Sequence, residues 1–365
     1  NKRIRFSSSK PSHLTTQLPN STVESILHIE HDGSSYTAIA RQSGLIDIYH
    51  EDDSEPIVSL TDNIRLSTDY VVSLNYCCNY LLSCSNRGLI VIYNFRKLIC
   101  SAIPKGDTQQ EPGFFIMINE PIEFCHNFPN EPFKFITGGY NNSLEVYNVA
   151  KDHEDHERQQ VKLSASPGSV LKICKSIITT KPDFKGAPYK GFSWLKDAVI
   201  LANYTPEDYT VVTATKFGKL IVYMPKITKM PIDTYQVSNH PILKVYSLSR
   251  KACGCSQTIL FFDAFNLIGL MDMNTEKIIK RFEVPLIGSI SSFEILNIKL
   301  NKEWLIFVSS IDKFLRIYQL SNVGGVSGFT LKSIGISKLD SIMPCIRVVD
   351  SDDASDLDFG YYEKK

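Results

Sequence analysis

The sequence has no excess of either charge and no apolar run of membrane-spanning length. It also has no signal-peptide pattern at its start. Lys and Arg together number 39, and so do Asp and Glu. A protein that binds nucleic acid by charge alone normally carries a basic excess, so the balance leaves only local basic patches open for such binding. We expect a globular chain that has no membrane as a partner.

Signatures of catalysis are also missing. The sequence contains no Gly-x-Gly-x-x-Gly loop, no Gly-x-Ser-x-Gly elbow and no recognisable pair of carboxylates at matching strand ends. Cys253 and Cys255 lack a second pair at zinc-site spacing, and the run from His153 to Glu157 lacks the spacing of a metal-binding helix. We therefore predict no enzyme activity, no cofactor, no metal and no small-molecule substrate.

Nine Cys residues are scattered along the chain, which is an odd number. Several stand inside apolar runs, for example Cys84 in LLSCS and Cys125 in IEFCH. Disulfide frameworks belong to small secreted domains. Buried free thiols are the better interpretation, and they predict a reducing compartment, either cytosol or nucleus.

A unit of about fourteen residues recurs six times and organises the sequence. Each copy has a short apolar strand, a tight turn and a second apolar strand, which in five copies ends in Tyr. Gly, Asn, Asp or Ser at the junction tolerates the backbone of a tight hairpin turn. The copies are YTAIARQSGLIDIY (36–49), YLLSCSNRGLIVIY (80–93), FKFITGGYNNSLEVY (133–147), TVVTATKFGKLIVY (210–223), ILFFDAFNLIGLMDM (259–273) and WLIFVSSIDKFLRIY (304–318).

Flanking apolar segments extend each hairpin toward four strands. We expect inner strands at 23–29, 71–76, 122–124, 198–202, 242–248 and 290–296. We expect outer strands at 57–60, 98–103, 278–284 and 329–334. Tyr49 and Tyr93 are 44 residues apart, which matches a WD-type blade of 40–45 residues.

The predicted fold class is all-β: a seven-bladed WD-type β-propeller, preferred to an irregular β-sandwich. A propeller must close its ring or leave two exposed sheet edges. We therefore expect the last blade to be closed by strands from both termini, at 4–8 and 344–350, with its remaining strands either upstream of Asn1 or weakly marked in the sequence. Residues 1–350 would form the propeller, with a polar insertion at about 151–190, and the acidic residues 351–365 would form a flexible tail.

The insertion and the last hairpin carry the candidate binding residues. Aromatic residues at 184, 189 and 192 alternate with lysines, a pattern suited to stacking on bases and holding a phosphate backbone. An ordinary solvated loop is the alternative. The candidate partner- or RNA-binding residues are Lys172, Lys175, Lys181, Lys185, Lys190, Lys313 and Arg316. For Asp312, in the turn beside Lys313, we expect a structural role that braces the backbone.

Three segments resemble one family, the nucleolar WD-repeat factors of large-ribosomal-subunit assembly. They are 220–245, 267–295 and 307–320. The family's last blade has a Gly-Leu-Asp-Arg-x-x-Arg-Ile pattern, which is matched here at Ile311, Asp312, Lys313, Arg316 and Ile317. Segment 121–149 is similar to the family's fourth blade. Segment 174–194 keeps only a Trp and scattered hydrophobic residues of the stretch that follows that blade in the family.

The resemblance implies a protein of the nucleus, mainly the nucleolus, that is bound to pre-60S particles. It implies contacts with pre-60S assembly factors and ribosomal RNA, and release by an AAA-type ATPase. A generic WD-repeat adaptor in another complex, such as a ubiquitin-ligase receptor or a trafficking coat, is the alternative function. A propeller enzyme would need carboxylates or His on several inner strands, which the sequence does not suggest.

Overall fold

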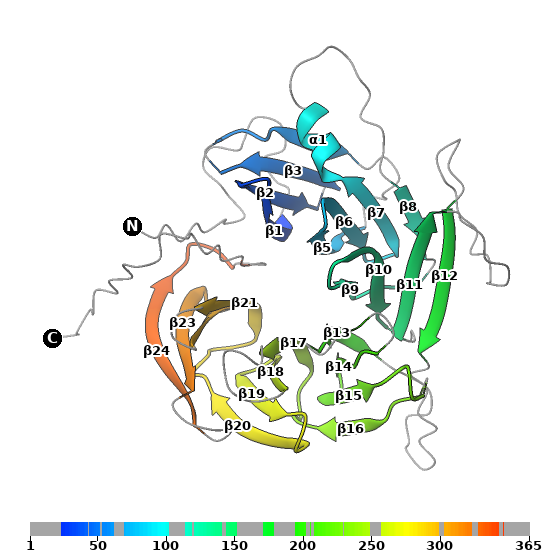
Figure 1. Cartoon of the computed structure of the whole chain (residues 1–365). Helices are drawn as coiled ribbons and strands as arrows, with labels where there is room; N and C mark the ends of the chain where they lie inside the picture. Colours follow the sequence, from blue (N-terminus) through cyan, green and yellow to red (C-terminus); the bar gives the residue numbers. More distant parts are fainter. Residues whose placement is uncertain are drawn as a thin grey trace.

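The computed structural model of the chain contains six four-stranded antiparallel sheets arranged like blades around an axis (Figure 1). The structure describes residues 23–342 except 43, 52, 62–68, 102–113, 119, 141–143, 152–170, 179–193, 202–204, 206–207, 229, 249–256, 299–302 and 323–327, and it also describes residue 346. In each sheet the four strands lie side by side in chain order.

The first three sheets come from the first half of the chain. The first contains β1 (Val23–His31), β2 (Ser34–Arg41), β3 (Leu45–His50) and β4 (Val58–Thr61). The second contains β5 (Val71–Cys77), β6 (Tyr80–Ser85), β7 (Leu89–Asn94) and β8 (Phe114–Met117), with helix α1 (Phe95–Ser101) between its last two strands. The third contains β9 (Phe124–Phe128), β10 (Glu131–Gly138), β11 (Leu144–Lys151) and β12 (Leu171–Ile178).

The other three sheets follow the same plan. The fourth contains β13 (Leu195–Ile200), β14 (Val211–Thr215), β15 (Lys219–Tyr223) and β16 (Asp233–Gln236). The fifth contains β17 (Ile242–Leu248), β18 (Thr258–Asp263), β19 (Leu267–Asp272) and β20 (Lys277–Glu283). The sixth contains β21 (Ile290–Ile298), β22 (Glu303–Ser310), β23 (Phe314–Asn322) and β24 (Phe329–Lys338).

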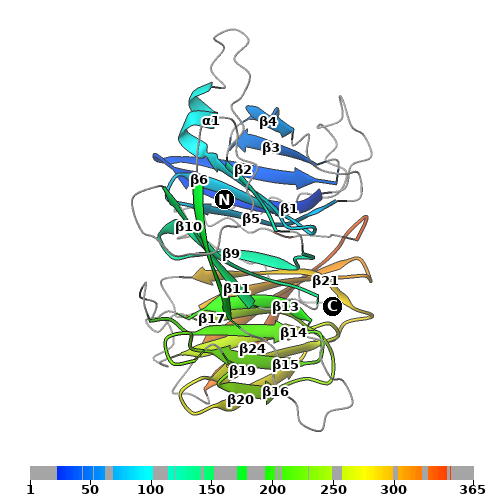
Figure 2. The same cartoon turned by 90° about the vertical axis from the view of Figure 1, so that its right-hand side faces the viewer.

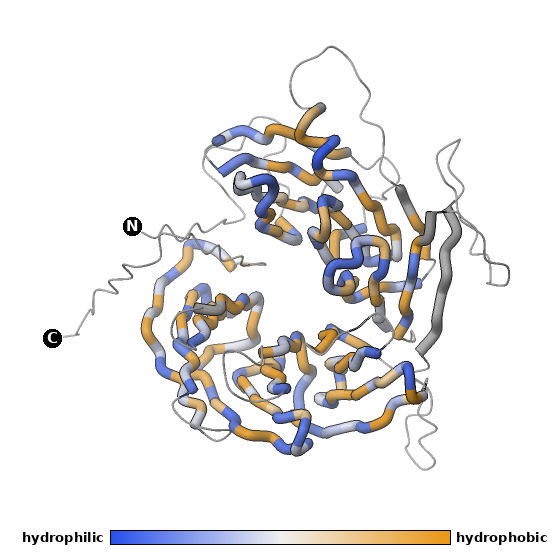
Figure 3. The backbone as a smooth tube through the Cα atoms, in the orientation of Figure 1, coloured by the Kyte–Doolittle hydropathy of each residue, from blue (hydrophilic) through white to orange (hydrophobic). Residues whose placement is uncertain are grey.

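The hydrophobic core lies between neighbouring sheets. The first strand of each sheet is nearest the axis and the fourth is at the rim (Figure 1). The middle strands are apolar on both faces because each face packs on a neighbouring sheet; in β18 all six residues are buried. One cluster joins the first and second sheets around Ile29 and Leu81, and another joins the fifth and sixth around Phe262 and Trp304. Apolar stretches accordingly recur along the middle strands (Figure 3).

The predicted propeller is confirmed, but the predicted number of seven blades is wrong: the structure shows six. Each of the six sheets is built from one continuous run of four strands, so none of them combines strands from both termini. The expected strand at 4–8 lies outside the described residues. Within 344–350 the structure describes Ile346 alone, which is not in a strand and packs on Leu305, Phe307 and Leu315 of the sixth sheet.

The expected outer strand at 98–103 is also wrong, because residues 95–101 form α1. Asn94 caps this helix through a hydrogen bond from the Lys97 N–H to its Oδ1 (3.0 Å). Phe95 and Leu98 are spaced three residues apart and both are buried. The outer strand of the second sheet is β8 instead. The view turned by 90° shows α1 at the periphery of the molecule (Figure 2).

Part of the expected insertion at 151–190 is regular structure. Residues 171–178 form β12, which pairs along its whole length with β11. The third sheet therefore reaches its fourth strand only after a long connection. Among the described residues, no helix is long and apolar enough to cross a membrane.

Candidate interaction surface

One end of the ring gathers all the turns between second and third strands. In an antiparallel sheet of four strands, this turn and the link from the fourth strand to the next sheet emerge at the same end. Hydrogen bonds join the two kinds of connection: Val237 N–H donates to Gly218 O (3.0 Å) and Val284 N–H donates to Asn266 O (2.8 Å). We call this end of the ring the turn face.

Side chains at the ends of the second strands hold these turns. Ser85 Oγ accepts the N–H of Leu89 at 3.0 Å, and Thr215 Oγ1 accepts the N–H of Lys219 at 3.0 Å. Asp263 goes further, because its Oδ1 accepts the N–H groups of residues 265, 266 and 267 at 3.0–3.1 Å. The carboxylate thus satisfies three backbone donors that the turn leaves without backbone partners. Side chains of the turns themselves therefore hold the backbone of these turns.

Asp312 performs the same task in the sixth sheet. Its carboxylate accepts the N–H of Phe314 (3.0 Å) and of Ile287 (3.3 Å), so the expected bracing role is confirmed. Arg316 donates two hydrogen bonds to this carboxylate, from Nη2 to Oδ2 at 2.6 Å and from Nη1 to Oδ1 at 3.1 Å. Burial alone would raise the pKa of Asp312, but hydrogen bonds from Arg316, Ser310 and the backbone outweigh it and lower that pKa well below its usual value.

An aromatic and cationic cluster surrounds Trp194 on the same face. The Tyr140 ring meets the indole edge to face, with the centroids 4.7 Å apart. Lys216 places its ammonium 3.4 Å from the indole centroid, which is a cation–π contact. The indole Nε1 donates to Glu123 (2.9 Å), and Lys196 pairs with the same carboxylate at 2.9 Å.

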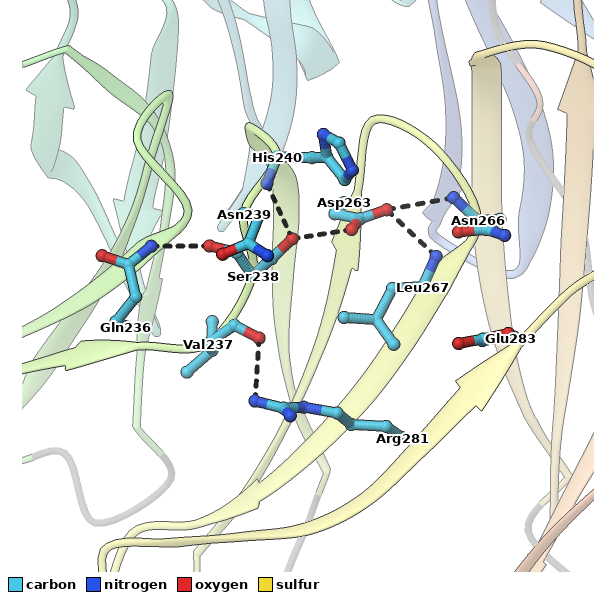
Figure 4. Close-up of a pocket in the computed structure, with 10 residues that line it drawn as sticks. All are labelled: Gln236, Val237, Ser238, Asn239, His240, Asp263, Asn266, Leu267, Arg281 and Glu283. Carbon is cyan, nitrogen blue, oxygen red and sulfur yellow. Dashed lines mark hydrogen bonds between the residues drawn. The ribbon is translucent and has the colours of Figure 1, made fainter.

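A pocket of about 310 Å³ opens between the fourth and fifth sheets (Figure 4). Its floor is the buried Asp263, which accepts a hydrogen bond from Ser238 Oγ (2.7 Å). Arg281 Nη2 donates to the Val237 carbonyl at 3.3 Å and closes one side. The full lining is Gln236, Val237, Ser238, Asn239, His240, Asp263, Asn266, Leu267, Arg281 and Glu283.

Three charged or titratable side chains meet on the inner strands. Asp197 of β13, whose side chain is 2% exposed, lies 2.7 Å from His126 Nε2 and 3.4 Å from Lys244 Nζ. It also accepts the N–H of Val245 at 3.0 Å. Burial raises the pKa of Asp197, but Lys244 and His126 outweigh it and hold the pKa below the ordinary value. The cluster therefore ties the third, fourth and fifth sheets together.

Sequence reasoning missed this cluster, because the inner strands look apolar when each is taken alone. The available signal was Asp197 in LKDAVI, a strand whose other polar residue is Lys196. An acidic residue there needs a partner when it is buried. The partners are 71 and 47 residues away in the chain, so only the ring brings them together.

The residues predicted to bind partners are dispersed. Lys172 and Lys175 are in β12, opposite Ala150 and Tyr147 of β11. Lys181, Lys185 and Lys190 lie outside the described residues, as do the motifs at 153–157 and at Cys253 and Cys255. Among the described residues, no group of three or more His, Cys, Asp or Glu could hold a metal ion.

The last two candidates, Lys313 and Arg316, are close in sequence but differ in exposure. Lys313 is exposed on the turn face, with a φ of 65°. The side chain of Arg316 is 8% exposed and pairs with Asp312. The structure therefore leaves Lys313 accessible to a partner, while the guanidinium of Arg316 is engaged within the turn.

No family model matches the chain. The chain is 22% identical over 295 residues to the ribosome biogenesis protein nsa1 of Schizosaccharomyces pombe, an alignment that covers 77% of this chain and 68% of that protein. Two solved structures share the fold. One is Saccharomyces cerevisiae Sqt1, with a TM-score of 0.56 and 12% identity over 85% of this chain and 73% of that one.

The other is the β-propeller domain of Myceliophteria thermophila Cps50 (Swd1), with a TM-score of 0.58 and 10% identity over 87% of this chain and 91% of that one. At such low identities these two structures speak for the fold alone. The sequence relationship is the more informative of the two kinds of likeness. The chain is a β-propeller that is similar in sequence to a ribosome biogenesis protein, as the resemblance predicted.

Proposed function

We propose that the chain is a non-catalytic scaffold of ribosome biogenesis that binds pre-60S particles. The observation that carries this proposal is the similarity to a ribosome biogenesis protein along 77% of the chain. The fold supports it physically, because six sheets arranged around an axis offer a wide surface of turns and links. Binding by such a surface depends on area and complementarity and needs no reactive group.

The finer assignments belong to the same proposal. The direct partners are pre-60S assembly factors, the place of action is the nucleus and mainly the nucleolus, and an AAA-type ATPase releases the chain from the particle. Ribosomal RNA is a further partner, for which the exposed Lys313 and the lysines at 172, 175, 181, 185 and 190 are the candidate contacts.

Sedimentation of a tagged chain through a sucrose gradient tests the scaffold proposal. We expect the chain to sediment with precursors of the large-subunit ribosomal RNA and not with small-subunit precursors. Sedimentation at the position of the free chain, with no precursor RNA in its fractions, would contradict it. Co-purification of ubiquitin-ligase or coat subunits in place of precursor RNA would favour the adaptor alternative.

Ultraviolet cross-linking separates contact with RNA from contact with protein inside the same particles. If RNA is touched directly, cross-linked peptides should include at least one of the candidate lysines, and replacing that lysine with Glu should remove the cross-link. Particles that yield protein cross-links alone would remove RNA from the proposed partners while leaving the scaffold role intact.

A further inference from the structure

Exposed apolar side chains concentrate on the turn face. Six large ones stand on its turns and links, with exposed fractions between 43% and 78%: Tyr70, Tyr140, Phe217, Phe265, Ile287 and Ile311. A soluble protein gains nothing from clustering such side chains in water, so a contiguous set of them marks a binding surface. The opposite end has exposed apolar residues in the β15–β16 link, among them Ile227 and Met230.

Contacts run from Tyr140 to the Phe217 turn in one group and between the Ile287 and Ile311 segments in another. Phe265 packs on His240, which lines the pocket described above. Tyr140 packs on Trp194, which carries Lys216 on its face, and Phe217 follows Lys216 in the chain. Gln236 donates to the Phe217 carbonyl at 3.0 Å, which brings the link of the fourth sheet against this turn.

On the far side of the pocket, His240 packs against the Phe265 ring with the centroids 4.2 Å apart. A Cβ placed on Gly288, next to Ile287, would lie 2.5 Å from Ile311, so the two isoleucine-bearing segments touch. We call the set Tyr140, Trp194, Phe217, Phe265, Ile287 and Ile311 the apolar arc.

The pocket lies in the middle of the arc and has polar walls (Figure 4). Asn239 and Asn266 are exposed at its mouth, and their side-chain amides make no hydrogen bond with other described residues. Such amides can pair with the backbone of a peptide. Its volume of about 310 Å³ is at the lower end of the range for ligand pockets.

The charges on the arc indicate the occupant. Lys216 stands beside Phe217, and Lys313 stands two residues after Ile311, so a cation is exposed toward each end. The acid nearest to Lys313, Asp312, is neutralised by Arg316. Two lysines on turns of different sheets are too few to neutralise a run of phosphates, which argues against a nucleic-acid backbone. They do complement acidic residues placed between apolar ones.

We propose that the apolar arc binds an extended segment of a partner protein in which aliphatic side chains alternate with acidic ones. In an extended chain, alternate side chains point to opposite faces, so the aliphatic set faces the aromatic and Ile side chains of the arc. The acidic set points away from the arc, and the long, exposed side chains of Lys216 and Lys313 reach it from the edges of the segment. The backbone of the segment crosses the mouth of the pocket and pairs with the amides of Asn239 and Asn266. This inference rests on the proposed scaffold function and names the chemistry of a partner.

Fluorescence anisotropy with the isolated full chain tests the inference. The probe is a fluorescein-labelled 12-residue peptide of alternating Leu and Asp. The comparison probes are the same peptide with Lys in place of Asp, and a 12-nucleotide oligouridine. We expect binding of the Leu–Asp peptide alone, weakened by added salt because both lysines are exposed.

Variants locate the binding. Phe217→Ser with Phe265→Ser should weaken binding at least about tenfold, since buried aromatic anchors dominate such interfaces. Lys216→Ser with Lys313→Gly should weaken it by about threefold and reduce its salt dependence; Gly suits the φ of 65° at position 313. The matched control, Ile227→Ser with Met230→Ser at the opposite end, should bind as the parent does. All changed side chains are exposed, so the thermal unfolding midpoint should stay within a few degrees of the parent's.

The inference is overturned if the Leu–Asp peptide does not bind, if either comparison probe binds as tightly, or if the Phe217/Phe265 variant matches the control. The sucrose-gradient result is independent of this assay. If the chain sediments with precursor RNA but does not bind the peptide, the proposed peptide site is wrong and the scaffold function stands. If the chain binds the peptide but does not sediment with precursor RNA, the ribosomal assignment is wrong and the peptide site stands.

Discussion

Arg316 and Asp312 form a two-point ion pair beneath the β22–β23 turn, with N–O distances of 2.6 and 3.1 Å. Both side chains are less than a tenth exposed. The pair has three roles. It neutralises a buried charge, it holds a turn of the sixth sheet, and it connects that turn to the link at Ile287. The carboxylate of Asp312 therefore already has its charge and hydrogen-bond partners within the protein, at the edge of the surface that we propose for binding.

Replacing Arg316 with Ala should destabilise the chain by about 3 kcal/mol, because the change leaves a buried carboxylate without its charged partner. Asp312→Ala should have an effect of similar size, and the double variant should lose less than the sum. Urea unfolding measures all three free energies. If the free-energy losses of the two single variants add up fully in the double variant, the two side chains do not interact directly. Lys313→Gly, on the same turn, serves as the control.

Asp197 should make stability depend on acid. Its folded pKa lies below the unfolded value of about 3.9, so the folded state binds fewer protons in that range. The stabilisation is complete above the unfolded pKa and is lost as the pH falls through the folded one. Asp197→Asn should lower the free energy of unfolding at pH 7 and flatten its decline between about pH 5 and pH 3. Equal slopes for parent and variant would rule out this contribution.

Gly218 should tolerate no side chain. Its φ is +73°, and a Cβ would lie 2.0 Å from the Ser238 carbonyl oxygen. Gly218→Ala should therefore destabilise the chain by about 3 kcal/mol or more, the sum of backbone strain and a clash with main chain. Gly33 is the matched control, since it has a φ of +78° with nothing within 4 Å of its Cβ position. Gly33→Ala should cost about 1 kcal/mol, from strain alone.

Calorimetric or urea unfolding of the two glycine variants provides the comparison. If both lose the same stability, the close approach of the Ser238 carbonyl contributes nothing. Lys313→Gly belongs in the same series, because Lys313 already has a φ of 65°. Relief of strain and the entropy of a new Gly oppose each other there, so the change should stay below about 1 kcal/mol.

The cysteines should differ in their rates of alkylation. Cys78 is exposed, whereas burial and the hydrogen bond to Cys78 raise the pKa of Cys77 to about 12. Cys84 and Cys125 are buried, and burial raises the pKa of Cys125 well above its usual value. Since the thiolate is the nucleophile, iodoacetamide at pH 8 should modify Cys78 before Cys77, and Cys125 only after unfolding.

Peptide mass spectrometry at timed intervals resolves each site. Adding urea above the unfolding midpoint should bring the four rates within a few-fold of one another, which controls for intrinsic reactivity. Modification of Cys125 as fast as Cys78 under native conditions would contradict the placement of Cys125 in the cluster between the second and third sheets.

Local pattern was enough to identify the hairpins. Each copy of the repeat carries its own apolar strands and its own turn residue, and β17 begins and ends where the sequence predicts, at Ile242 and Leu248. Local pattern failed at residues 95–101, where a cap from Asn94 and two apolar residues three apart produce a helix in a stretch that also suits a strand. Strand and helix cannot be distinguished by apolarity over so few residues.

The sequence by itself determined that this chain is a set of repeated β-hairpins forming a propeller, because strand alternation and turn chemistry are properties of neighbouring residues. The tertiary structure decided the number of sheets and the partners of Asp197. It also decided the make-up of the apolar arc, which gathers residues from Tyr140 to Ile311 on one face. These depend on which sheets lie side by side, and no short-range pattern encodes contacts between residues that are far apart in the chain.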